Sequence, residues 1–177
     1  MKYESQKVAY VYFVGAMVLF AAQVTFGLVA GYIYVAPNTL SELLPFNIIR
    51  MIHTNALIVW LLLGFFGAAY YLIPEEAERE IESVKLAYIQ FAIIFLGAAA
   101  AVVGYVFRVH GGREFLEQPT WVKLGIVVAA LIFLYNVTMT VLKGRKTAIT
   151  NVLLLGMWGI AIFFLFALWN PNNLVVD

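Results

Sequence analysis

Residues 50–74 read RMIHTNALIVWLLLGFFGAAYYLIP, and from His53 to Pro74 this stretch carries no formal charge. A helix needs roughly 20 consecutive apolar residues to cross the hydrocarbon core of a bilayer, which is about 30 Å thick. The stretch is therefore predicted to be a membrane-spanning helix. An arginine and a histidine lie one helical turn apart at its beginning.

The whole chain shares this character. Of its 177 residues, 64% are hydrophobic and 12% are charged, whereas soluble domains are nearer to half apolar and a quarter charged. We predict an all-α, polytopic membrane protein that forms a single transmembrane domain over residues 1–177. Five charge-free runs place its spans near 9–35, 48–73, 85–108, 120–142 and 148–169.

Prolines and small residues give two further expectations. An internal proline removes a helical hydrogen bond, and we expect all five prolines at segment ends or in loops: Pro37, Pro45, Pro74, Pro119 and Pro171. Small residues gather at 64–69 and 97–101, and such patches favour close contact between helices.

Lysine and arginine predict the orientation, because they are enriched in cytoplasmic loops. With the N-terminus inside, seven of these residues lie on the inner side and four on the outer side. We therefore expect a cytoplasmic N-terminus and place the start of span 48–73 at the outer face. The seven inner residues are Lys2, Lys7, Arg79, Lys85, Lys143, Arg145 and Lys146, and the four outer ones are Arg50, Arg108, Arg113 and Lys123.

The composition excludes several kinds of function. The formal net charge is only +1, so no basic patch indicates nucleic-acid binding. The chain has no cysteine, which excludes disulfides, thiolate metal sites and cysteine-attached haem. Two histidines cannot form a histidine-rich metal centre, which needs at least three ligands. No predicted span contains Asp or Glu, so the spans encode no buried carboxylate relay.

His53 is the principal candidate for a ligand. An ionisable group inside a membrane span is costly and therefore a functional candidate, and imidazole is a common axial ligand of haem iron. Arg50, one turn away, could pair with a haem propionate, because an arginine fork matches a carboxylate. The alternative is a structural histidine that bonds to a neighbouring helix.

The predicted topology brings the loop 109–119, VHGGREFLEQP, to the same face as Arg50. Arg113 could neutralise a propionate, and Glu114 could bind a hard cation such as calcium. Glu117 belongs to the same neighbourhood. The alternative for Arg113 and Glu114 is a solvated loop with a surface ion pair. His110, the other histidine, is interpreted as an exposed loop residue.

Four stretches resemble the large, haem-binding subunit family of bacterial nitric oxide reductases, a branch of the haem-copper oxidase superfamily. They are PFNIIRMIHTNALIVWLLLGFFGAAYYLIPEE (45–76), GREFLEQPT (112–120), VTMTVLKGRKTAITNVLL (137–154) and NPNNL (170–174). The family reduces two molecules of nitric oxide, with two electrons and two protons, to nitrous oxide and water. Its electrons come from a cytochrome c subunit or from quinol.

The resemblance implies roles for individual residues. His53 matches an axial ligand of the low-spin haem b. Arg50 and Arg113 match arginines near the haem propionates. Glu114 matches a carboxylate at a calcium ion, and Glu117 a second acidic position of the loop. The expected location is the bacterial inner (cytoplasmic) membrane.

The chain also departs from the family pattern. The second ligand of the low-spin haem, the ligand of the high-spin haem and the ligands of the non-haem iron belong to later spans of such subunits. We therefore expect this chain to work with a C-terminal half and not to reduce nitric oxide alone. Two other interpretations remain open: a non-catalytic membrane scaffold, and part of an oxygen-reducing terminal oxidase.

Overall fold

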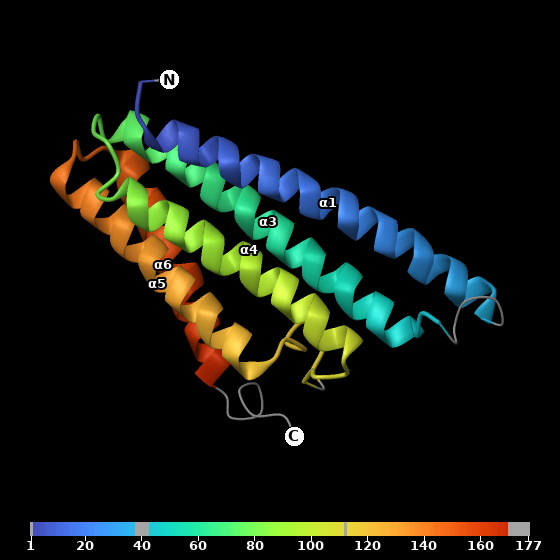
Figure 1. The fold of residues 1–177 in the computed structure, drawn as a ribbon. Coiled ribbons are helices and arrows are strands. Elements are labelled where there is room, and N and C mark those ends of the chain that lie inside the picture. Colours follow the sequence, from blue (N-terminus) through green and yellow to red (C-terminus); the bar gives the residue numbers. More distant parts are fainter. Residues whose placement is uncertain (1, 38–42, 112, 170–177) are drawn as a thin grey trace.

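The computed structural model describes residues 2–37, 43–111 and 113–169, and it is all-helical over these ranges. The stretch NPNNL (170–174) and Pro171 lie outside them. The helices follow one another as up-and-down rods (Figure 1). Their bounds are α1 Ser5–Val35, α3 Phe46–Glu76, α4 Val84–Val106, α5 Thr120–Lys143 and α6 Ala148–Trp169.

Four of these helices are long and apolar enough to cross a membrane, namely α1, α3, α4 and α5. The apolar stretch described in α6, Ala148–Phe163, is shorter. Four of the five expected spans are thus supported by length and composition, and the span at 148–169 stays a prediction.

The helices form a bundle with two distinct ends. α1 packs along α3 over most of its length, α4 pairs with α5, and α6 lies mainly against α5 (Figure 1). One end, here called the Arg50 end, holds the end of α1, the start of α3, the end of α4 and the start of α5. The opposite end, called the Lys143 end, holds the start of α1, the α3–α4 loop and the α5–α6 turn.

Aromatic side chains from three helices fill the centre of the core. The ring of Phe133 on α5 lies 4.5 Å from that of Phe66 and 5.5 Å from that of Tyr70, both on α3. Tyr12 of α1 completes the group, 5.5 Å from Tyr70. Edge and tilted contacts of this kind add to the burial of large apolar rings, and they fix how α1 and α5 sit around α3.

Only part of the small-residue pattern produces close contact. A β-carbon added at Gly67 would lie 3.1 Å from atoms of Tyr12 and Phe13, so α1 approaches α3 closely there. A β-carbon added at Gly64, on the same helix, would have no neighbouring atom within 4 Å among the described residues. The composition of the patch favours contact, but the rotation of the helix decides which glycine makes it.

The helix bounds differ from the expected ones for identifiable reasons. α1 begins four residues before position 9, because the Glu80 carboxylate accepts hydrogen bonds from the backbone amides of Glu4 (2.5 Å) and Ser5 (3.2 Å). Helix N-termini carry such unsatisfied amides and favour negative charge. α4 ends at Val106 rather than 108, where Arg108 takes a positive φ of 60°.

Pro74 lies at a segment end, as expected, but within the helix and not beyond it. This residue lies inside the last turn of α3, which continues to Glu76. The helix tolerates it because only one bond is lost so close to its end. Three residues after Pro74, the amide of Ala77 still donates to the carbonyl of Ile73 at 2.8 Å.

Polar contacts fasten the α3–α4 loop to α5 at the Lys143 end. The amide of Ser83 donates to Asn136 Oδ1 at 2.8 Å, and Asn136 Nδ2 donates back to the Ser83 carbonyl at 2.9 Å. Lys143 Nζ lies 2.5 Å from Glu82 Oε1, and its hydrogen bond lowers the pKa of Glu82. These contacts stabilise the Lys143 end. The candidate functional residues lie at the opposite, Arg50 end.

Candidate functional site

His53 lies on α3 at the Arg50 end, with its imidazole turned toward α1. Its Nδ1 lies 2.8 Å from the backbone carbonyl oxygen of Gln23. A carbonyl can only accept, so Nδ1 must carry the proton, and the longer 3.4 Å approach of Gln23 Nε2 to the same atom is then not a hydrogen bond. This arrangement selects the tautomer in which Nε2 keeps its lone pair.

Gly27 makes this position of the ring possible. A β-carbon at Gly27 would lie 2.6 Å from His53 Cε1 and 2.7 Å from Nδ1. Separations this short force one of the two groups to move, so only glycine lets α1 approach the imidazole so closely. Gln23 and Gly27, one turn apart on α1, together hold the ring by a hydrogen bond and by shape.

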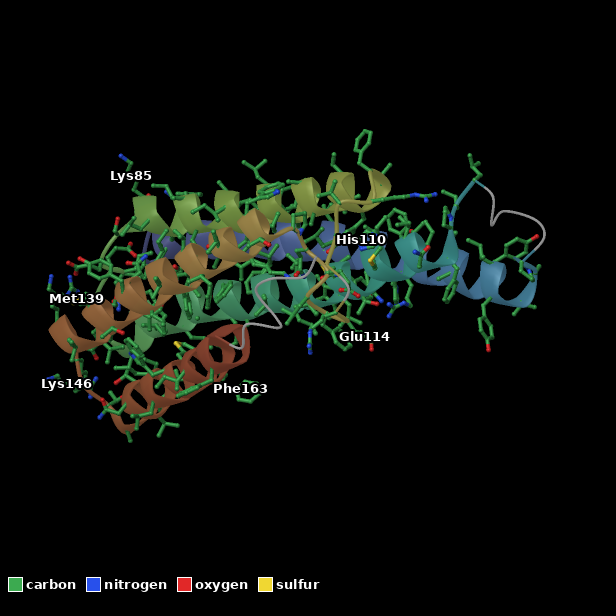
Figure 2. The ribbon with its side chains drawn as sticks, turned by 90° about the horizontal axis from the view of Figure 1, so that it is seen from below. Lys85, His110, Glu114, Met139, Lys146 and Phe163 are labelled. Carbon is green, nitrogen blue, oxygen red and sulfur yellow. The ribbon has the colours of Figure 1, made fainter. Side chains whose placement is uncertain are left out.

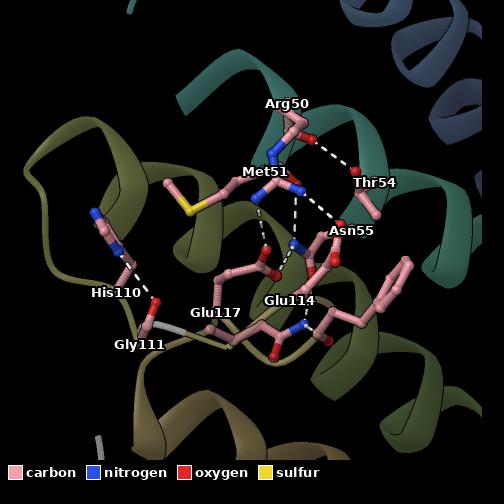
Figure 3. Close-up of polar contacts among 10 residues, drawn as sticks. Arg50, Met51, Thr54, Asn55, His110, Gly111, Glu114 and Glu117 are labelled. Atoms are coloured by element: carbon pink, nitrogen blue, oxygen red, sulfur yellow. Dashed lines mark hydrogen bonds and ion pairs between the residues drawn. The ribbon is translucent and has the colours of Figure 1, made fainter. Parts of the chain in front are cut away.

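Arg50, one turn before His53, is the centre of a charged group. Its guanidinium lies 2.7 Å from Glu114 Oε1 and 3.7 Å from Glu117 Oε1 (Figure 3). The Glu114 side chain is 62% exposed and that of Glu117 only 3%. Because exposed ion pairs contribute little and buried ones much more when broken, these two contacts of Arg50 have different energetic weight.

Asn55 connects the buried carboxyl of Glu117 to α3. Asn55 Nδ2 donates to the Met51 carbonyl at 2.9 Å and to Glu117 Oε2 at 3.0 Å, and Asn55 Oδ1 accepts a hydrogen bond from Gln118 (Figure 3). The loop closes on itself through the Gly111 amide, which donates to the Glu117 carbonyl at 2.8 Å. The α4–α5 loop is therefore docked on α3 by buried polar groups.

Further polar groups surround Glu117. Lys123, in the first turn of α5, is 2% exposed and interacts electrostatically with it, as does Tyr105 at the end of α4. Within the described ranges, three buried polar atoms here have no hydrogen-bond partner: Glu117 Oε1, Gln118 Oε1 and Tyr105 Oη. A native structure rarely leaves such atoms without a partner, so this cluster is a polar centre inside the Arg50 end.

The other two loop residues lie apart from this cluster. Arg113 is exposed, and it makes no ion pair with any residue that the structure describes. His110 is also exposed; its Nδ1 donates to the Gly111 carbonyl at 3.2 Å, and its ring lies edge-on to Tyr105. In Figure 2 His110 and Glu114 lie on the loop, away from Lys85 and Lys146 at the other end of the bundle.

The structure thus brings together three of the residues expected to share one rim: Arg50, Glu114 and Glu117. His53 lies one turn below them. The residues that support them were not expected from the sequence, namely Gln23, Gly27, Asn55, Gln118 and Lys123. Only Lys123 gave a signal in the sequence. A lysine in the first turn of a predicted span suggests a buried acidic partner, which here is Glu117.

The carboxylates do not form a metal cage by themselves. Over the described ranges, no group of three or more His, Cys, Asp or Glu side chains is placed to hold a metal ion. His53, with Nε2 unprotonated and Nδ1 bonded to a carbonyl, has the usual arrangement of a metal-ligating histidine.

Comparison with known proteins defines the class. The family described as Cytochrome C and Quinol oxidase polypeptide I matches residues 7–176, so the chain belongs to this haem-copper oxidase family and is an integral membrane protein. It is 52% identical, over 191 aligned positions, to the B subunit of nitric oxide reductase from Stutzerimonas stutzeri. That alignment covers all of this chain and 40% of the relative.

A second relative lies in the oxidase branch. Cytochrome c oxidase subunit 1 of Rhodobacter capsulatus is 32% identical over 82 residues, which is 45% of this chain and 14% of the relative. The similarity to the nitric oxide reductase subunit is therefore both higher and more extensive. The chain spans well under half the length of either relative.

Proposed function

We propose that this chain forms the electron-accepting part of a nitric oxide reductase large subunit, in which His53 is one axial ligand of the low-spin haem b. The observation that carries this proposal is the hydrogen bond from His53 Nδ1 to the Gln23 carbonyl, 2.8 Å long. It holds the ring and leaves Nε2 free to bind iron. A bound haem would supply one-electron transfer, and the chain would hold and orient it.

Arg50 and Arg113 are proposed to neutralise the haem propionates at the Arg50 end. Arg50 is 38% exposed and one turn from His53, so it is within reach of a carboxylate at the rim. Arg113 is exposed and not engaged by an acidic residue within the described part of the chain. Guanidinium groups suit this role because they pair with carboxylates in a bidentate manner.

The remaining ligands would come from outside this chain. The alignment covers 40% of the Stutzerimonas stutzeri protein. We propose that the counterpart of its remaining part supplies the second ligand of the low-spin haem and the ligands of the high-spin haem and the non-haem iron. The electron donor would be a cytochrome c subunit or quinol. We place the N-terminus in the cytoplasm, five spans across the bacterial inner membrane, and the Arg50 end outside.

The test of the reaction uses the native assembly that contains this chain. We expect membranes with the assembly to convert nitric oxide to nitrous oxide with a reduced cytochrome c or quinol, and not to consume oxygen rapidly. The measurements are gas chromatography of nitrous oxide and an oxygen electrode. Rapid oxygen uptake without nitrous oxide would assign the chain to a terminal oxidase, and absence of haem from the assembly would indicate a non-catalytic scaffold.

Glu114 is proposed to bind calcium together with propionate oxygens. Its carboxylate is 62% exposed and bound to Arg50, so a cation must compete with the guanidinium for it. We expect Glu114→Ala to lose about one calcium ion per assembly, because a calcium site of six to eight oxygens is weakened by loss of a charged ligand.

Elemental analysis of the purified assembly would measure this loss. Glu78→Ala is the matched control, since Glu78 is also a half-exposed carboxylate paired with an arginine, Arg145, but at the Lys143 end. Equal calcium in Glu114→Ala and the unmodified assembly would return Glu114 to the role of a surface ion pair.

A further inference from the structure

Two adjoining cavities open on the side of the Arg50 end where α4 meets the start of α3. The first has a volume of about 280 Å³ and a polar lining that includes Asn47, Arg108 and His110. The second has a volume of about 370 Å³ and is lined almost entirely by apolar side chains. They share Pro45, Ile48 and Arg108, so one continuous groove has a polar mouth and an apolar interior.

The apolar part reaches into the bundle between three helices. Its walls are Phe26 of α1, Ile52 of α3 and Val102 of α4, with Val106 nearer the mouth. From Pro45 to Ile52 the groove descends about 10 Å along α3, at about 1.5 Å per residue. Since α3 and α4 are long enough to span a membrane, the mouth lies at the level of lipid headgroups and the interior at the level of acyl chains.

Arg108 gives the mouth its charge. Its side chain is exposed, and among the described residues no acidic one lines either cavity. Its backbone is held at a φ of 60°, the left-handed conformation in which many α-helices end. The Arg108 amide donates to the Tyr105 carbonyl at 3.0 Å, which ends α4 and sets the side chain at the rim.

We propose that this groove binds one anionic phospholipid, with its phosphate on Arg108 and an acyl chain between Phe26, Ile52 and Val102. The charge of the mouth and the apolar interior match the two parts of such a molecule. Arginine binds phosphate in a bidentate manner, and basic pockets between transmembrane helices bind anionic headgroups. The site is distinct from the Arg50 group, because neither Arg50 nor its two carboxylate partners line either cavity.

Native mass spectrometry of the delipidated assembly, titrated with phosphatidylglycerol, tests the proposal. We expect one tightly retained phosphatidylglycerol, and at least about tenfold weaker retention in Arg108→Gln, because a charge-assisted hydrogen bond is lost. Val106→Trp, which keeps the charge but places a large ring at the mouth, should also lose the lipid. Lys85→Gln is the matched control: it removes one charge from the opposite end of α4 and should retain the lipid.

The other outcomes overturn the proposal. Equal weakening in Arg108→Gln and Lys85→Gln would mean general attraction of anionic lipid. Equal retention of phosphatidylcholine and phosphatidylglycerol would remove the role of charge. Displacement by inorganic phosphate or by a short-chain quinol at similar concentration would make the occupant a free anion or an electron donor. Circular dichroism of each variant shows whether its helices are intact, so a folding defect is separable from loss of the lipid.

Discussion

Replacing His53 with alanine is expected to abolish the low-spin haem b absorbance of the complete assembly. The proposed iron ligand is Nε2, which the hydrogen bond from Nδ1 to the Gln23 carbonyl leaves unprotonated. Methyl cannot replace imidazole as a ligand, so the haem would lose an axial bond. The measurement is the reduced-minus-oxidised difference spectrum, together with the haem content per assembly. We expect haem content to fall by one per assembly, or its spectrum to become high-spin.

His110→Ala is the control for the His53 substitution, because His110 is the only other histidine and is exposed on the loop. It should keep the full haem spectrum. An unchanged spectrum in His53→Ala would exclude His53 as a ligand and leave it as a structural histidine that bonds α3 to α1.

A second pair of variants separates ligation from folding. Gly27→Ala places a β-carbon 2.6 Å from His53 Cε1, so the ring must move and the low-spin spectrum should shift or weaken. Gly31→Ala, one turn further along α1, meets nothing within 4 Å and should leave it unchanged. Both changes raise helix propensity by about 0.5–1 kcal/mol, so a difference between them reports the displacement of His53.

The sequence was sufficient to predict the helices because charged residues separate the apolar runs so clearly. The five ranges agree with the structure to within a few residues, and the disagreements arise where distant groups act. Glu80 extends α1 from 75 residues away, by accepting from the amide of Ser5. The backbone of Arg108 ends α4 early. Neither effect leaves a signal in the local pattern.

The candidate site was predictable by location but not by role. The topology alone placed Glu114 and Glu117 beside Arg50, and both contacts are present. It could not tell which carboxyl is buried, because that depends on how the loop folds through the Gly111 to Glu117 hydrogen bond. Nor could the topology show that His53 faces α1, because that depends on how α3 is oriented about its own axis.

Asn55→Leu is expected to release the α4–α5 loop from α3. Leucine matches asparagine in size but cannot donate to Glu117 Oε2 or accept from Gln118. The Glu117 side chain is 3% exposed and would then lose its one hydrogen-bond donor among the described residues. An unsatisfied buried group costs about 1–3 kcal/mol, and more when it is charged. We therefore expect the docked loop to be destabilised by about 2 kcal/mol or more.

Hydrogen–deuterium exchange measures this destabilisation directly. The amides of Gly111 and Leu116 are hydrogen-bonded within the loop and serve as reporters. A change of about 2 kcal/mol corresponds to about 30-fold faster exchange. Thr54→Val is the matched control, because Thr54 Oγ1 donates only to the Arg50 carbonyl of its own helix, at 2.8 Å, and loop exchange should stay unchanged.

A double-mutant cycle with Glu117→Gln identifies the origin of the effect. If the cost of Asn55→Leu comes from the buried carboxyl, it should shrink when Glu117 is already an amide, since contacting residues are not additive. The same cost in both backgrounds would assign the loss to Gln118 and to packing instead. In that case the docking of the loop would depend on the amide pair, and the charge that Arg50 shares with Glu117 would be secondary.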